Sequence, residues 1–291
     1  MKKPSASSLI AKGLRWISRK NVEWFMALIG AAMVAAVVAI TLLAPFIAPY
    51  DPLERNVGKQ FEEPSAQFMM GTDIHGRDVY SRMLHGSRTV MLVASVSMTI
   101  SMLIGIPLGL LSGYSGGAID RLLSLIMDSV YAFPGLILAI AIAAMLGPGV
   151  INMSVAIAIV YIPTYFRMVR GQSLSIKENL YVEAARSIGA KGRTIIFRYI
   201  FPNIIPSIVV LISVNIADAI LTEAGLTFLG LGISAPTPDW GFDLHMGQPY
   251  LPAGKWWLIT FPGLMIILVV VGFSLLGEGL NEILNPKLRE R

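Results

Sequence analysis

The sequence has no cysteine, which excludes disulfide bonds, thiolate metal ligands and a cysteine nucleophile. Only three histidines occur, His75, His85 and His245, and their spacing does not match that of metal ligands. Charged residues make up just 14% of the chain against 55% hydrophobic residues, which is too few to cover a soluble globule. We therefore expect a polytopic membrane protein of the all-α class, without a metal site.

Catalytic motifs are missing as well. A phosphate-binding loop needs a glycine-rich turn that ends in Gly-Lys-Ser/Thr, and the run Gly189-Ala-Lys-Gly-Arg-Thr194 has the wrong order. No other group of residues forms a catalytic set, so we expect neither catalytic residues nor a cofactor bound by this chain. The formal net charge of +5 would suit nucleic acid, but the basic residues are dispersed beside apolar runs, as membrane topology requires. We therefore expect no nucleic-acid partner.

Long apolar runs are what the sequence has in abundance. A transmembrane helix needs about 20 residues, and the runs predict six spans, at about 25–49, 89–112, 122–146, 151–166, 207–229 and 258–276. The third of these spans is expected to be interrupted at Phe133-Pro134-Gly135. The first run is too long for the apolar core of a cleaved signal peptide. The predicted organisation is a cytoplasmic tail 1–24, a first span 25–49, an extracytoplasmic segment 50–88, a core 89–280 with five further spans and a cytoplasmic loop at about 171–203, and a cytoplasmic tail 281–291.

The distribution of positive charge tests this topology. Of the 23 Lys and Arg residues, 17 fall in segments assigned to the inside and 6 in segments assigned to the outside. Cytoplasmic loops of membrane proteins carry an excess of Lys and Arg. Both termini are therefore expected in the cytoplasm, together with the loop 171–203.

The loop 171–203 is a charged island between apolar runs. Ser175-Ile-Lys-Glu178 has the spacing of a capping box and predicts a helix start, and Gly189 is the expected terminator because glycine tolerates a left-handed backbone. A second short helix is expected from Gly192 to Tyr199, ended near Pro202. The product is a bent helix pair, on which Glu183 offers charge and Ala184 and Ala185 offer a side-chain-poor face for close approach by a partner.

Two outer segments carry local signals. In the run Met70–Arg82, glycines and short polar residues predict a turn, and Asp78 is placed to cap a helix that leads towards the second span. The segment from Gly232 to Lys255 contains four prolines and Trp240, and Trp256 and Trp257 follow directly after it. Because Trp favours the headgroup level of a bilayer, this pattern predicts an interfacial hairpin.

Polar residues inside the predicted spans mark either a bundle interior or a pathway, because a charge in hydrocarbon is costly. The candidates are Asp128, Asn215, Asp218 and Glu223. Asn215, Asp218 and Thr222 fall at helical offsets 0, 3 and 7, on one face of the fifth span. A structural role and contact with a transported solute both remain open. The stripe Gly105, Gly109 and Gly113 on the second span predicts close helix packing.

The cytoplasmic loop also resembles a known motif. The order Glu183-Ala184-Ala185, three residues, Gly189 and then Phe201-Pro202 resembles the EAA loop of the membrane subunits of ABC importers. Two positions depart from the family pattern: Tyr199 replaces the usual isoleucine, and Phe201 replaces the usual leucine. Both replacements are apolar. The resemblance implies that this loop is the coupling helix that docks on a separate ATPase, with Glu183, Ala184, Ala185 and Gly189 as the coupling residues.

Three longer stretches resemble one branch of that family. The run Met70–Arg82 is similar to the Gly-Thr-Asp-x-x-Gly-Arg-Asp-x-x-Ser-Arg signature of C-type permeases of peptide and nickel ABC importers. The matching residues are Gly71, Thr72, Asp73, Gly76, Arg77 and Asp78. The segments 228–241 and 261–263 with 276–289 resemble the same family, although Asn285 lacks the acidic charge usual there.

This resemblance implies the type I ABC importer permease fold, in the cytoplasmic (inner) membrane of a prokaryote. The chain would form a heterodimer with a B-type permease, in the lipid bilayer, and the pair would alternate between inward and outward access. Two cytoplasmic ATPase subunits would use ATP and Mg²⁺, and an extracytoplasmic binding protein would deliver the solute. Peptides are the favoured cargo, with nickel complexes, glutathione and oligosaccharides as alternatives. A different class, a secondary transporter or channel without an ATPase, would also explain the intramembrane acids.

Overall fold

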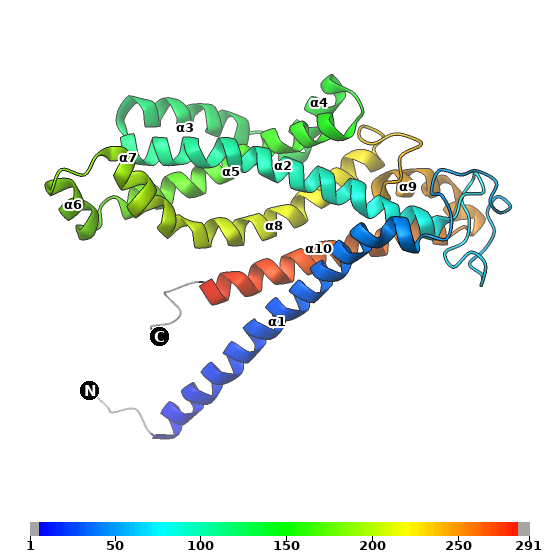
Figure 1. The fold of residues 1–291 in the computed structure, drawn as a ribbon, viewed down its shortest axis with the longest axis horizontal. Helices are drawn as coiled ribbons and strands as arrows, with labels where there is room; N and C mark the ends of the chain where they lie inside the picture. Colours follow the sequence, from blue (N-terminus) through cyan, green and yellow to red (C-terminus); the bar gives the residue numbers. More distant parts are fainter. Residues whose placement is uncertain (1–5, 285–291) are drawn as a thin grey trace.

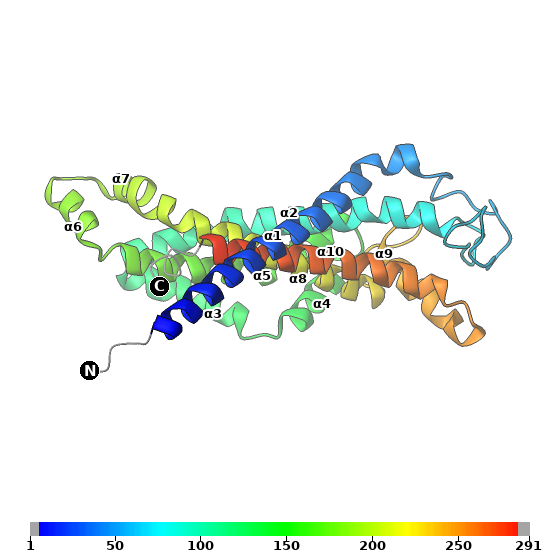
Figure 2. The same ribbon diagram turned by 90° about the horizontal axis from the view of Figure 1, so that it is seen from below.

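The protein is an elongated bundle of helices, seen from two sides in Figures 1 and 2. The computed structural model describes residues 6–284, with side chains from residue 24 onward. The helices are α1 (Ala6–Ile47), α2 (Val79–Ser115), α3 (Gly117–Tyr131), α4 (Gly135–Leu146), α5 (Val150–Ile176), α6 (Leu180–Ser187), α7 (Gly192–Thr194), a π-helical segment (Ile195–Ile200), α8 (Phe201–Phe228), α9 (Trp240–Gly247), a 3₁₀ segment (Gln248–Ala253) and α10 (Trp257–Leu284). The predicted all-α class is confirmed.

Five helices of the described part are long and apolar enough to span a membrane, and the pair α3 and α4 makes a sixth span if it is counted as one. These two helices are bent by 88° at the break between them. The break falls at Phe133 and Pro134, where the sequence predicts an interruption, because proline cannot continue the hydrogen-bonding of a helix. In Figure 2 the bent pair lies along one flank of the bundle.

The predicted glycine stripe lies in a close contact between α2 and α5. At Gly105 and Gly109 an added Cβ would lie 2.8 Å and 2.7 Å from the carbonyl oxygens of Ile162 and Phe166 on α5. At Gly113 it would lie 2.6 Å from the Cβ of Ser173. The small residues therefore let the backbones of α2 and α5 approach closely, which holds the centre of the bundle together.

We expect Gly109→Ala to lower the thermal stability of the detergent-solubilised protein, because its methyl group would collide with backbone. Overpacking of this kind costs about 1–3 kcal/mol. Gly171→Ala is the matched control, since Gly171 is also helical but has no atom within 4 Å of an added Cβ. Thermal unfolding of the two variants decides the point, and equal stability would show that the α2–α5 contact is not as tight as described.

The loop between α5 and α8 differs from the sequence prediction in two respects. Ser175 does not begin a helix: it lies in the last turn of α5, and α6 starts at Leu180 after Asn179, whose backbone is extended. The reason is tertiary, because Ile176 packs on the cluster that contains Val169 and so keeps the chain helical beyond the predicted start. Lys177 then donates to the carbonyl oxygen of Gly113 at 2.9 Å, which fixes the end of α5 against α2.

The second difference concerns the end of the loop. The predicted short helix does not stop near Pro202; it continues through the π-helical segment into α8. Pro202 lies in the first turn of α8, where a missing backbone N–H costs least. The predicted terminator is confirmed, since Gly189 follows α6 with a φ of +85°.

Of the three tryptophans at 240, 256 and 257, two pack inside the protein. Trp240 and Trp257 are fully buried, and their indole N–H groups donate to the carbonyl oxygens of Met83 at 2.9 Å and Thr72 at 3.2 Å. Only Trp256 of this group has a largely exposed side chain. The indoles of Trp240 and Trp257 therefore each find a carbonyl partner inside the protein, whereas the interfacial position of the hairpin stays a prediction.

Candidate functional site

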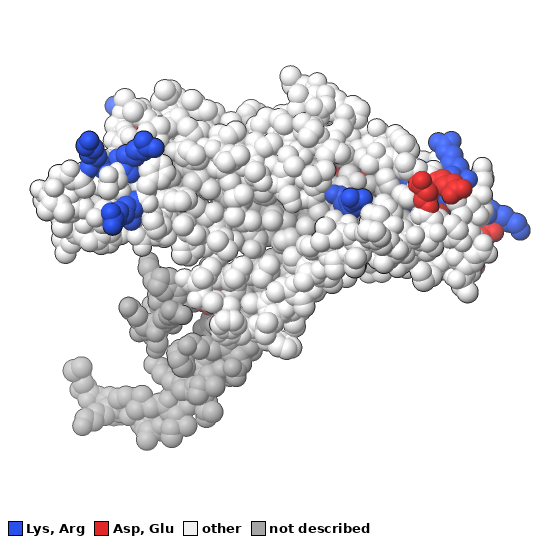
Figure 3. Space-filling view, in the orientation of Figure 1, with Lys and Arg blue, Asp and Glu red and all other residues white. Residues whose placement is uncertain are grey.

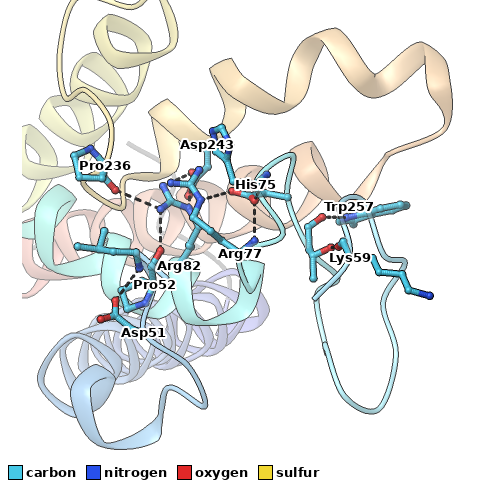
Figure 4. Close-up of polar contacts among 12 residues, drawn as sticks. Asp51, Pro52, Lys59, His75, Arg77, Arg82, Pro236, Asp243 and Trp257 are labelled. Carbon is cyan, nitrogen blue, oxygen red and sulfur yellow. Dashed lines mark hydrogen bonds and ion pairs between the residues drawn. The ribbon is translucent and has the colours of Figure 1, made fainter. Parts of the chain in front are cut away.

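The run 70–82 folds into a compact turn at the end of the bundle opposite α6. Asp73 accepts hydrogen bonds from the backbone N–H groups of His75 at 2.7 Å and Arg77 at 2.9 Å. Its second oxygen accepts from Arg77 Nε at 2.6 Å, and both side chains are largely buried. Figure 4 shows Arg77 and His75 close to one another in this turn. A carboxylate that closes its own turn in this way fixes the shape of the loop.

The rest of the predicted motif supports the same turn. Asp78 caps α2, as the sequence predicts, because its Oδ2 accepts from Ser81 N at 2.8 Å and Ser81 Oγ at 2.6 Å. Thr72 Oγ1 accepts from the backbone N–H of Glu62 at 2.8 Å. Gly71 and Gly76 have φ values of +74° and +66°, which other residues rarely adopt. All six predicted motif residues, Gly71, Thr72, Asp73, Gly76, Arg77 and Asp78, therefore belong to one folded loop.

A buried ion pair that the sequence analysis missed ties this loop to α9. Arg82 donates through Nε and a terminal nitrogen to Asp243 Oδ1, at 2.9 Å and 2.6 Å, and its side chain is only 1% exposed. The other terminal nitrogen reaches the carbonyl oxygens of Pro52 at 3.1 Å and Pro236 at 3.5 Å. Figure 4 shows Arg82 at the junction of these three segments. The sequence did contain one signal for this ion pair, because an arginine in the first turns of an apolar helix needs a partner.

Two buried acidic residues lie close together where α8 meets α9. Glu223, one of the predicted intramembrane acids, and Asp239 are both fully buried. Glu223 Oε1 accepts from Thr227 Oγ1 at 3.0 Å, whereas Asp239 Oδ1 caps α9 by accepting from Phe242 N at 2.9 Å. The remaining oxygens, Glu223 Oε2 and Asp239 Oδ2, are buried and have no hydrogen-bond partner among the described residues. Burial raises the pKa of Asp239 to about 6.

We expect this raised pKa to make stability fall as the pH rises. The ordinary pKa of the group is 3.8 and the folded value is about 6, so between these values the folded protein binds more protons than the unfolded chain. Protonated Asp239 makes its full contribution to the free energy of unfolding below pH 3.8, and this contribution is lost as the pH rises past 6. Asp239→Asn keeps the cap but does not titrate. It should therefore reduce the loss of stability between low and neutral pH by on the order of 1–3 kcal/mol. The exposed Asp51→Asn serves as control, and parallel curves for wild type and Asp239→Asn would show that the pKa of Asp239 is not raised by folding.

At the opposite end of the bundle, α6 presents an apolar surface. Leu180 and Ile188 have 82% and 85% of their surface exposed, and Glu183 and Ala184 are exposed between them. Ala185, by contrast, is only 4% exposed and packs with Val182 towards the bundle. The predicted common face of Ala184 and Ala185 is therefore wrong, because neighbouring residues on a helix point in different directions. The two exposed apolar side chains were not singled out from the sequence.

A cavity of about 600 Å³ lies between the bent pair α3–α4, α5 and α8, and we call it the pathway cavity. Its polar lining comes from Tyr161, Thr164, Asp218 and Thr222. The Tyr161 hydroxyl donates to Asp218 Oδ2 at 2.6 Å and lies 3.4 Å from Thr222 Oγ1. Asp218 and Thr222 thus share a face as predicted.

The other predicted intramembrane residues lie outside this cavity lining. Asn215, one turn before Asp218 on α8, is buried and is not part of the cavity wall. Asp128 forms an ion pair with Arg167 at 3.5 Å, and both side chains are about half exposed. The Arg167 guanidinium also lies 4.5 Å from the ring centre of Tyr131.

Comparison with known proteins identifies the relatives of this chain. Residues 105–290 match the family model described as binding-protein-dependent transport system inner membrane component, and residues 26–64 match the N-terminal TM domain of oligopeptide transport permease C. The dipeptide transport system permease protein DppC of Alkalihalophilus pseudofirmus is 39% identical over 264 residues, which cover 91% of this chain and 86% of that protein. The glutathione transport system permease protein GsiD of Pectobacterium atrosepticum is 41% identical over 272 residues, 93% and 90% of the two chains.

A solved structure shares the fold. A chain of the MetNI methionine ABC transporter in an inward-facing conformation matches with a TM-score of 0.57 and 18% identity, over 70% of this chain and 96% of that chain. At that identity the likeness supports the arrangement of the helices alone. The predicted ABC importer permease fold is confirmed.

Proposed function

The chain belongs to the family of binding-protein-dependent transport system inner membrane components, as a C-type permease of an ABC importer, and we propose that it carries short peptides across the membrane. The names of its relatives support this cargo, because they refer to dipeptides and to glutathione, which is itself a tripeptide. Nickel complexes and oligosaccharides are less favoured on the same ground. Membership of this family sets aside a secondary transporter or channel that works alone.

Membership of the family implies ATPase and binding-protein partners for this multi-pass inner membrane protein. The finer arrangement is our proposal: a heterodimer with a B-type permease, two cytoplasmic ATPase subunits that use ATP and Mg²⁺, and both termini in the cytoplasm. The charge distribution supports this orientation. In Figure 3 basic residues gather at the end that carries α6 and α7, a largely uncharged belt follows, and acidic and basic residues mix at the other end. Positive charge favours the cytoplasmic side.

The helix α6 is the proposed contact with an ATPase. Its exposed Leu180 and Ile188 flank Glu183 and Ala184, and Gly189 turns the chain back directly afterwards. Exposed apolar side chains on a water-facing loop are the kind of anchor that fills a pocket on a partner. Ala185 would act indirectly, by packing α6 onto the bundle so that movement of one is transmitted to the other.

The folded loop 70–82 is the proposed contact with the binding protein or the outer gate. Asp73 and Arg77 neutralise one another and are buried, so they give the loop its shape. The contact itself would come from the exposed residues around them. The Glu223–Asp239 pair and the Arg82–Asp243 pair would hold the hairpin after α8 against this loop during transport.

Uptake in a defined system tests the function. The chain is reconstituted in vesicles with its B-type permease, ATPases and binding protein, and uptake of radiolabelled dialanine is measured with and without ATP. We expect uptake of dialanine to need both ATP and the binding protein. An excess of glutathione, or of a dipeptide other than dialanine, should compete with this uptake. If a nickel complex or an oligosaccharide is taken up while dialanine is not, the peptide cargo is wrong although the family assignment stands.

A further inference from the structure

The pathway cavity contains a carboxylate that the packing of this chain does not use. Asp218 lies within the spanning part of α8, yet its side chain is exposed to the cavity. A charge within a membrane span is costly unless water, a cation or a hydrogen-bonding partner stabilises it. A residue at this depth is therefore expected either to hold helices together or to meet something that enters the cavity.

The contacts of Asp218 favour the second role. Its Oδ2 accepts the hydroxyl of Tyr161 at 2.6 Å, and among the described residues no Lys, Arg or His lies at ion-pair distance. The nearby cation Arg167 is already engaged, by Asp128 at 3.5 Å and by the Tyr131 ring. A phenol alone does not neutralise a carboxylate, so the cavity keeps one uncompensated negative charge.

Two other acids of the described spans differ from Asp218. Glu223 is fully buried and accepts a hydrogen bond from Thr227, and Asp128 is paired with Arg167. Asp218 alone among these three combines an open cavity with the lack of a cationic or acidic partner in the described structure. Tyr161, itself almost fully buried, holds the carboxylate through Oδ2, and Oδ1 accepts no hydrogen bond from the residues that the structure describes.

We propose that Asp218 receives the protonated amino group of the peptide as it passes through the pathway cavity, with Tyr161 as the positioning residue. This proposal rests on the proposed peptide cargo. The α-amino group of a peptide has a pKa of about 7.7–8.0 and is therefore cationic at neutral pH. It donates charge-assisted hydrogen bonds to a carboxylate. Because every unmodified peptide carries this group, one carboxylate recognises the class of cargo without selecting its side chains.

The remaining lining suits such a guest. The rings of Tyr131 and Phe133 line the cavity, and aromatic faces attract ammonium groups. The hydroxyls of Thr164 and Thr222 offer further hydrogen bonds. A volume of about 600 Å³ lies within the range of pockets for small ligands, about 300–1,000 Å³. The open, hydrated setting of Asp218 keeps the interaction weak enough for the peptide to leave.

Charge-selective labelling tests the site without depending on transport. The chain has no cysteine, so Thr164→Cys creates a single thiol in the cavity wall. In the assembled importer, we expect cationic trimethylammonium-ethyl methanethiosulfonate to react about tenfold faster than its anionic sulfonate analogue, relative to a thiol at the exposed outer residue Gln67. Adding Asp218→Asn should remove this preference at Thr164→Cys and leave Gln67→Cys unchanged. No preference at Thr164→Cys would mean that a partner subunit neutralises Asp218, and would overturn the proposal.

Uptake provides the second test. Asp218→Asn should lower dialanine uptake about tenfold, while Asp218→Glu should restore most of it and the affinity of the binding protein for dialanine stays constant. If Asp218→Asn fails to assemble, Tyr161→Phe replaces it; this change should keep the labelling preference and lower uptake about threefold. Normal uptake by these variants would refute the proposal. Absence of uptake by the wild-type importer would instead count against the peptide cargo, which the labelling experiment does not require.

Discussion

Replacement of Arg82 by methionine is expected to remove most of the folded protein. The change leaves Asp243 without its partner in a buried place, and it also frees the carbonyl oxygen of Pro52. Burial already raises the pKa of Asp243 even beside Arg82, so the lone carboxyl would have to take up a proton to remain inside. Breaking a buried ion pair costs about 3–5 kcal/mol, against a total stability of about 5–15 kcal/mol.

Recovery of membrane-inserted protein and thermal unfolding in detergent measure this effect. Arg55→Met is the matched control, because Arg55 lies in the same outer segment but is exposed. The double variant Arg82→Met/Asp243→Leu should recover part of the loss, since an apolar pair of similar size leaves no charge buried. Equal stability of Arg82→Met and Arg55→Met would show that the pair does not hold the outer end together.

Replacement of Ile188 by aspartate is expected to release the ATPase subunits. The side chain of Ile188 is 85% exposed at the end of α6, so the change should not disturb this chain itself. In the proposed contact, however, it would place a charge in an apolar pocket of the partner. Loss of a central apolar anchor costs about 2 kcal/mol or more, which corresponds to at least a thirtyfold weaker contact.

Co-purification of the ATPases with the tagged chain, and ATP hydrolysis stimulated by the loaded binding protein, are the two readouts. Ser187→Asp adds the same charge to the neighbouring exposed residue and should have a smaller effect, because serine is not an apolar anchor. If Ile188→Asp retains its ATPases and full transport, α6 is a connecting helix and the proposed coupling surface lies elsewhere.

Much of the architecture follows from local patterns in the sequence. The length of the apolar runs indicates the spans, since each must cross the same hydrocarbon thickness. The break at Phe133 and Pro134, the turn at Gly189 and the cap at Asp78 arise from the backbone preferences of single residues. The glycine stripe of α2 was predictable because a four-residue spacing places small residues on one face of any helix.

The sites depended on contacts between residues far apart in the chain. Arg82 and Asp243 are 161 positions apart, and no periodicity in either segment indicates that they meet. Asn215 and Asp218 look equivalent on a helical wheel, but the helices packed around α8 bury one and leave the other open to the cavity. Likewise Ser175 has a capping spacing, yet packing of Ile176 extends α5 past it. The apolar pattern thus determined which segments become helices in the membrane, whereas the tertiary packing decided which polar groups are neutralised and which remain available, because that depends on the partner each side chain meets.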